Sequence, residues 1–251
     1  MAASTEKRDE LVDKWVAPLV VEAIGTFALI FFGAGSIIMT GNGDLIAIAL
    51  AHGLAIALLI MAAGHISGGL YNPALTVGLW VGRKMTADKM AAYIVVQLIG
   101  AVLAALALKA VFPSELTDAV DLGVPAVGVD FNAGRAFVAE IIATFFLMFA
   151  VYGNAVDPRG KGPVYGLGIG LIIAMSIFAV GNVSGAAMNE ARWFGPALVE
   201  NIWTDAWVWI VGPLVGAVLA ALVYNELLLP ARPAEPSEPP VTAGPETTAR
   251  T

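Results

Sequence analysis

The chain alternates between long apolar stretches and short polar connections, and six of the stretches are long enough to cross a membrane. Each holds 18 to 24 residues, about the length of helix that a hydrocarbon core requires. The stretches are residues 16–39, 45–64, 90–112, 136–156, 164–181 and 206–229. Within them the charged side chains are only Glu22, Lys109, Glu140 and Glu226. The pattern therefore predicts six membrane-spanning helices.

The composition supports this prediction and excludes several classes of protein. Hydrophobic residues make up 59% of the chain and charged residues 13%, with a mean hydropathy of +0.82, which is too apolar for a soluble enzyme. The absence of cysteine removes disulfides, thiolate metal sites and cysteine nucleophiles. Two histidines and a net charge of −7 favour neither a histidine metal site nor a nucleic-acid partner. We expect no enzymatic activity, no cofactor and no metal.

The distribution of Lys and Arg predicts how the chain is oriented. Ten bases fall in the two ends and in the second and fourth connections: Lys7, Arg8, Lys14, Arg83, Lys84, Lys89, Arg159, Lys161, Arg232 and Arg250. Three fall on the other side: Lys109, Arg135 and Arg192. We therefore expect a multi-pass protein of the cell (plasma) membrane with both termini cytoplasmic. Residues 1–15 form a short cytoplasmic segment before the membrane domain of residues 16–229. Residues 230–251, with six prolines, are expected to be a disordered cytoplasmic tail.

The membrane domain contains an internal repeat. Glu22-Ala-Ile-Gly-Thr-Phe matches Glu140-Ile-Ile-Ala-Thr-Phe at an offset of 118 residues, and Asn72 matches Asn189 at an offset of 117. Repeat one covers about residues 16–112 and repeat two about residues 134–229. Each repeat holds three spans, an odd number, so the second copy must enter the membrane from the opposite face. Such inverted repeats are typical of membrane transport proteins with a site near the bilayer midplane.

Each repeat also predicts a short helix that enters the membrane without crossing it. In Asn72-Pro73-Ala74 the asparagine is a good N-cap and the proline suits the first helical position. The matching segment is Asn189-Glu190-Ala191. Two half-helices from opposite faces would meet N-terminus to N-terminus, where their dipoles and asparagine amides favour neutral hydrogen-bonding molecules and repel cations.

These motifs resemble those of the major intrinsic protein family, the aquaporins and glycerol facilitators, and the pattern is nearest to microbial aquaporins. The resemblance covers residues 16–229. It implies an all-α integral membrane protein with six transmembrane helices, two re-entrant half-helices and a pore in each subunit of a homotetramer, embedded in the lipid bilayer. The backbone carbonyls that it implies along the pore belong to Gly68, Gly69, Leu70, Gly185, Ala186, Ala187 and Met188.

The resemblance also implies a narrow selectivity filter formed by His52, Ile177, Ala186 and Arg192. This set resembles that of plant vacuolar-membrane aquaporins, whose pores take water and often ammonia, urea or peroxide. We therefore expect a passive channel for water, with ammonia, urea, peroxide and glycerol as candidate further solutes. The alternatives are a glycerol-type facilitator and an ion-coupled secondary transporter.

Three acidic residues bear on these alternatives. Glu22 and Glu140 lie at matching positions inside apolar spans, where a carrier would use them as proton relays. The resemblance instead implies that each accepts backbone N–H bonds and holds a re-entrant loop. Glu190 departs from the family, which has proline there. A carboxylate at this position suits the helix dipole, but when ionised it subtracts positive potential at the place where the pore is expected to reject protons and cations.

Overall fold

The computed structural model describes residues 10–160, 162 and 164–229 as one set of helices and connections. The predicted tail of residues 230–251 and most of the N-terminal segment lie outside these residues. Helices η1 (Val12–Val16) and α2 (Ala17–Thr40) are continuous and are followed by α3 (Leu45–Ser67), α4 (Pro73–Val81) and α5 (Ala87–Val111). After a connection with α6 (Ser114–Asp118) and η2 (Asp121–Gly123) come α7 (Ala133–Val151) with η3 (Tyr152–Val156), α8 (Tyr165–Ser184), α9 (Glu190–Glu200) and α10 (Ala206–Val223) with η4 (Tyr224–Leu228).

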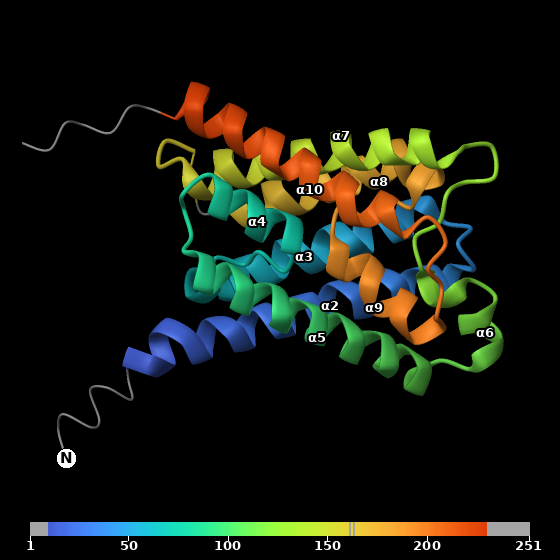
Figure 1. Cartoon of the computed structure of the whole chain (residues 1–251). Helices are drawn as coiled ribbons and strands as arrows, with labels where there is room; N and C mark the ends of the chain where they lie inside the picture. Colours follow the sequence, from blue (N-terminus) through green and yellow to red (C-terminus); the bar gives the residue numbers. More distant parts are fainter. Residues whose placement is uncertain (1–9, 161, 163, 230–251) are drawn as a thin grey trace, which may run out of the picture.

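The six long helices run side by side, and the two short ones lie among them (Figure 1). All six are long and apolar enough to cross a membrane, so the chain is an all-α, multi-pass membrane protein, as predicted. In the first half α2 packs against α5 and α3, and in the second half α7 packs against α10 and α8. The halves meet along α3 and α8. Both ends of the described chain lie at the same end of the bundle, which we call the terminal end; the opposite one is the far end.

Glycines at matching positions let the helices of each half approach closely. A Cβ on Gly100 of α5 would collide with the carbonyl oxygen of Ala23, and one on Gly216 of α10 with that of Ile141. Gly53 and Gly170 play the same role where α3 crosses α8, since a Cβ on either would meet the backbone of the other. Small residues are typical of such interfaces in membranes, because association there depends on close packing.

Five of the six observed helices extend beyond the predicted apolar stretch at one end or both, most clearly at the start of the chain. The first span runs over Val12–Thr40 rather than residues 16–39, and Asp13 and Lys14 in its added turn are exposed. A helix does not need to end where its apolar face ends, because polar side chains on its last turn reach water. Hydropathy therefore locates the span well and its ends less well.

Candidate functional site

The two short helices begin with the asparagine caps that the sequence predicts. The Asn72 Oδ1 atom accepts hydrogen bonds from the backbone N–H groups of Ala74 at 2.9 Å and Leu75 at 3.4 Å. The Asn189 Oδ1 atom accepts from Ala191 at 2.9 Å and Arg192 at 3.2 Å. Each side-chain oxygen thus satisfies N–H groups that a helix start leaves without partners, and each amide group is turned away from its own helix.

The asparagine amides join the two halves of the molecule. The Asn72 Nδ2 atom donates to the Met188 carbonyl at 2.7 Å, and the Asn189 Nδ2 atom donates to the Tyr71 carbonyl at 2.9 Å. A primary amide has two N–H groups, so each asparagine keeps one donor after making this bond. Both asparagines line the central cavity described below, where that donor can meet a passing molecule.

Two buried glutamates hold the loops that lead into the short helices. Glu22 accepts four hydrogen bonds, from Ser67 Oγ (2.7 Å), Leu70 N (3.0 Å), Tyr71 N (2.7 Å) and Gln97 Nε2 (2.8 Å). Glu140 accepts three, from Ser184 Oγ (2.7 Å), Ala187 N (2.9 Å) and Met188 N (2.7 Å). Because Tyr71 and Met188 direct their N–H groups to the glutamates, their carbonyls face the opposite way, toward the asparagine amides.

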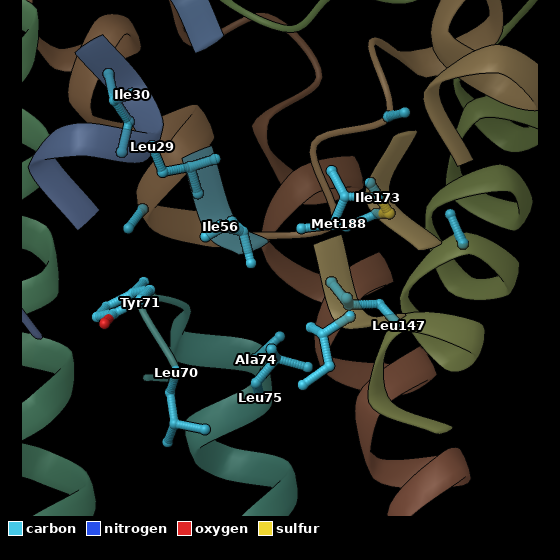
Figure 2. Close-up of a cluster of buried hydrophobic side chains, with 14 of the residues drawn as sticks. Leu29, Ile30, Ile56, Leu70, Tyr71, Ala74, Leu75, Leu147, Ile173 and Met188 are labelled. Atoms are coloured by element: carbon cyan, nitrogen blue, oxygen red, sulfur yellow. The ribbon is translucent and has the colours of Figure 1, made fainter. Parts of the chain in front are cut away.

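A narrow cavity lies where the halves meet. Its free volume is about 20 Å³, little more than the roughly 10–15 Å³ that one water molecule needs. Most of its wall is apolar, and Figure 2 shows Leu70 and Leu75 of the first half opposite Met188 of the second, with Ile56, Leu147 and Ile173 nearby. The polar part of the lining comes from His52, Asn72, Asn189 and Arg192, together with loop backbone. This cavity, which we call the passage, has room for about one water molecule at a time.

The cavity meets a wide vestibule of about 680 Å³ at the far end of the bundle, and His52 and Arg192 line both. Both side chains are buried. The Arg192 Nη1 atom donates to the carbonyl of Gly123 at 2.7 Å. The His52 Nδ1 atom lies 2.8 Å from the Ile48 carbonyl, which can only accept, so Nδ1 carries the hydrogen and Nε2 of the neutral ring is an acceptor. A cation and an imidazole, each held by a backbone carbonyl, therefore line both the narrow cavity and the vestibule.

The other predicted pore residues fall into three groups: those that line the narrow cavity, those that line the vestibule and one that lines neither. Gly69, Leu70, Ala186, Ala187 and Met188 line the narrow cavity. Gly185 and Ile177 line the vestibule instead. Gly68 lines neither, and its positive φ of 99° ends helix α3. The sequence prediction assigns these residues to the pore by counting back from the two asparagines. Whether each residue faces the passage depends on the backbone conformation of its loop, which counting does not give.

Glu190 occupies the first position of α9 and lies away from the passage. Its side chain is 8% exposed, and neither carboxylate oxygen has a hydrogen-bond partner among the described residues. It is not among the residues that line the narrow cavity or the vestibule. Elsewhere in the described part of the chain, His, Asp and Glu side chains form no group of three that could hold a metal ion.

Several contributing residues were missed by our sequence analysis. Ser67 and Ser184 lie in the repeated Ser-Gly motif, and their hydroxyls donate to the two glutamates. Gln97 is an uncharged polar residue within the apolar stretch of residues 90–112, and that position is the signal that could have identified it. Gly123 could not have been found, because its bond to Arg192 joins residues 69 positions apart through an irregular connection.

Comparison with known proteins places this geometry in a family. The family model of the major intrinsic proteins matches residues 12–224. Aquaporin TIP4-4 of Zea mays is 42% identical over 229 residues, which cover 85% of this chain and 87% of the relative. Aquaporin AqpM of Methanothermobacter marburgensis is 38% identical over 235 residues, with 83% and 96% covered.

A solved structure has the same architecture. The X-ray structure of the aquaglyceroporin from Plasmodium falciparum superposes with a TM-score of 0.77 at 25% sequence identity. The match covers 84% of this chain and 96% of that one. The two curated relatives are aquaporins and the solved structure is an aquaglyceroporin, so the likeness spans both branches of the resemblance stated above.

Proposed function

Because the chain belongs to the major intrinsic protein family and is a passive channel for water and small neutral solutes, we propose that water is its main substrate. The observation that carries this proposal is the small free volume of the central passage, about 20 Å³. A molecule with a carbon chain needs more room than this, whereas water molecules can pass in single file.

We propose that the passage compensates water for its lost hydrogen bonds at a few points. The loop carbonyls of Gly69, Leu70, Ala187 and Met188 accept hydrogen bonds, and the free N–H of each asparagine donates one. The apolar remainder of the wall holds water weakly, so no molecule is trapped. Glu22 and Glu140 serve as loop supports in this proposal, since their oxygens are occupied by three or four donors each.

His52, Ile177, Ala186 and Arg192 form the filter in this proposal. The guanidinium of Arg192 carries a permanent charge, which repels cations and donates hydrogen bonds to a neutral solute. His52 supplies an acceptor opposite it, and Ala186 leaves space on the wall. Ile177 lines the vestibule and limits the width of the entrance. No step makes or breaks a covalent bond, so we propose no enzymatic activity.

Cation exclusion depends, in our proposal, on Arg192 and on the two half-helix starts, each equivalent to roughly half a positive charge. Glu190 lies buried outside the passage lining, and in this proposal its carboxyl stays protonated, because an ionised carboxylate beside the half-helix start would cancel most of this potential. We further propose a homotetramer with a passage in each subunit. The terminal end lies in the cytoplasm and the vestibule outside the cell membrane, in agreement with the distribution of Lys and Arg.

Stopped-flow light scattering on proteoliposomes tests this function. With sucrose as the osmolyte we expect fast water efflux with weak temperature dependence, and with glycerol or urea gradients little solute entry. The double variant His52→Ala, Arg192→Val should raise glycerol and urea entry several-fold, because it removes the bulk and the charge at the constriction. Unchanged solute selectivity in a folded variant would contradict the filter assignment.

The same experiment separates the two alternatives. Glycerol entry as fast as water efflux in the unmodified protein would establish a facilitator, an outcome compatible with the structural likeness to an aquaglyceroporin. Fluxes that saturate with solute concentration and rise steeply with temperature would indicate a carrier. The occupied oxygens of Glu22 and Glu140 argue against a carrier, because a proton relay needs oxygens that are open to the transported ion.

A further inference from the structure

The terminal end of the bundle carries a second cavity, separate from the passage. It has a free volume of about 790 Å³ and lies between the start of the first helix, the end of α4 and the start of α5. Its lining is Lys14, Trp15, Trp80, Arg83, Lys84, Met85, Thr86, Ala87, Asp88 and Lys89. None of these residues lines the passage. We call it the basic cavity.

The charge of this lining contrasts with that of the whole chain. Four of its residues are basic and one is acidic, in a protein with a net charge of −7. The ion pairs found among the described residues, Lys109 with Glu200 and Arg159 with Asp157, use none of the four bases. Lys89 lies 5.4 Å over the ring of Tyr93, which leaves its charge in place. Four bases around one hollow favour an anion there.

The backbone holds two of the bases in a fixed turn. After α4 ends, the N–H of Arg83 donates to the Trp80 carbonyl at 2.9 Å and that of Lys84 to the Leu79 carbonyl at 2.8 Å. Arg83 has a φ of 59°, the left-handed conformation that often ends a helix. Bases at a helix end also suit its dipole, but the dipole explains neither the hollow nor the aromatic residues beside it.

Two tryptophans and an apolar stripe indicate what kind of anion fits. Trp15 is half-buried and Trp80 is 43% exposed, and tryptophan is enriched where a membrane protein crosses the lipid headgroup region. From Trp15 an exposed stripe runs into the membrane along every fourth residue: Val12, Val16, Val20 and Ile24. A ligand with a phosphate and an acyl chain could contact both the basic residues and this apolar surface. A free anion would contact only the basic residues.

We propose that the basic cavity binds one anionic phospholipid per chain. Its phosphate lies among Lys14, Arg83, Lys84 and Lys89, its glycerol region lies against Trp15 and Trp80, and an acyl chain follows the stripe on α2. Basic pockets between transmembrane helices bind anionic headgroups in this way. Because Trp80 belongs to α4, the bound lipid holds the helix whose other end presents Asn72 to the passage.

Native mass spectrometry of the detergent-solubilised full chain tests this proposal. We expect palmitoyl-oleoyl phosphatidylglycerol to bind one molecule per chain, and palmitoyl-oleoyl phosphatidylcholine to bind much more weakly. The variant Arg83→Gln, Lys84→Gln should bind phosphatidylglycerol on the order of tenfold more weakly. Arg83→Lys, Lys84→Arg keeps both charges and should bind as the unmodified chain does. Arg135→Gln, which removes an exposed base at the far end, is the matched control and should also leave binding unchanged.

Three results would overturn the proposal. Equal phosphatidylglycerol binding by the unmodified chain and by Arg83→Gln, Lys84→Gln would show that the bases do not hold the lipid. Equal binding of phosphatidylcholine would leave only apolar contact. Displacement of the lipid by millimolar inorganic phosphate would point to a site for a free anion. Size-exclusion chromatography and thermal unfolding check that each variant folds. If Arg83→Gln, Lys84→Gln does not fold, the double variant Lys14→Gln, Lys89→Gln provides the same test.

Discussion

The two halves of the molecule perform the same structural task with different residues. In the first half Tyr93 donates from its hydroxyl to the Ser67 carbonyl at 2.8 Å, and in the second half Trp209 donates from its indole to the Ser184 carbonyl at the same distance. Glu22 has a fourth donor in Gln97, whereas Pro213 occupies the matching place in the second half. The supporting geometry is therefore more uniform than the sequence that forms it.

The halves also differ at the starts of the two short helices. The first short helix carries Pro73, Ala74 and Leu75 after its cap, and the second carries Glu190, Ala191 and Arg192. An asparagine caps both short helices in the same way. The difference between them is therefore the charged side chains of Glu190 and Arg192 in the second helix. The comparison indicates that the second short helix adds a fixed cation, Arg192, to the cavity lining, and the first short helix has no counterpart to it.

Removing the glutamate supports should have the largest effect. Glu22→Gln and Glu140→Gln each place an amide donor opposite groups that already donate, and a buried donor without an acceptor costs about 1–3 kcal/mol. We expect both variants to lose several kcal/mol of stability, with Glu22→Gln the worse because it faces four donors rather than three. Thermal unfolding followed by tryptophan fluorescence in detergent measures this.

Glu115→Gln, an exposed change at the far end, is the control for those two variants and should unfold as the unmodified protein does. An equal loss in Glu22→Gln and Glu140→Gln would show that Gln97 adds nothing to the first support.

The aromatic donors give a smaller and unequal pair of effects. Tyr93→Phe removes only the hydroxyl and should cost about 1 kcal/mol. Trp209→Phe also removes part of a buried indole that stacks on Trp193 with a ring separation of 6.2 Å, so we expect about 2–3 kcal/mol. Chemical unfolding of the two variants side by side measures the difference. A larger loss in Tyr93→Phe would mean that the hydroxyl, not the ring, dominates.

Glu190→Pro makes the second half match the first and should raise stability slightly. It removes two buried oxygens that have no partner among the described residues, which we expect to gain about 1–2 kcal/mol. Water flux should stay nearly unchanged and proton and cation leaks should be equally negligible before and after the change, because Glu190 lies off the passage. Proteoliposome fluxes across pH measure both. A leak present only in the unmodified protein would refute this prediction.

The smallest expected effect on stability concerns the connection that follows the first long helix of each half, residues 41–44 in the first half and 157–164 in the second. In the first half this is a short turn, but in the second Asp157 accepts hydrogen bonds from Arg159, which also donates to the Leu228 carbonyl at 2.7 Å. Those hydrogen bonds hold the pKa of the Asp157 carboxyl well below its usual range. Its contribution to stability is therefore complete above the ordinary aspartate pKa of about 3.9 and is lost as the pH falls toward the lower value of the folded state.

Asp157→Asn should remove that pH dependence. The difference in unfolding temperature between Asp157→Asn and the unmodified protein should be constant above about pH 5 and shrink as the pH falls below about 4. A difference that grows on acidification would contradict the sign of the shift. Glu115→Gln again serves as the control.

Much of this architecture could be predicted from the sequence because it rests on local rules. Hydropathy located all six spans, and Asn72 with Pro73 marked a helix start by capping chemistry alone. The repeat predicted the inverted pairing of the halves. What could not be predicted depends on contacts between distant residues: the bond from Arg192 to Gly123, and the equivalence of Tyr93 and Trp209, which no matching of identical letters reveals. The predicted tail beyond residue 229 and the roles of the filter residues remain predictions.

The reciprocal asparagine bonds have a consequence for how the protein is made. Asn72 needs the carbonyl of Met188, 116 residues later in the chain. At a synthesis rate of about 5–20 residues per second, that partner emerges about 6–23 seconds after Asn72. During this interval the side-chain amide of Asn72 lacks the acceptor that it has in the complete protein. A nascent chain therefore cannot complete this pair of bonds until about three quarters of its residues have been made.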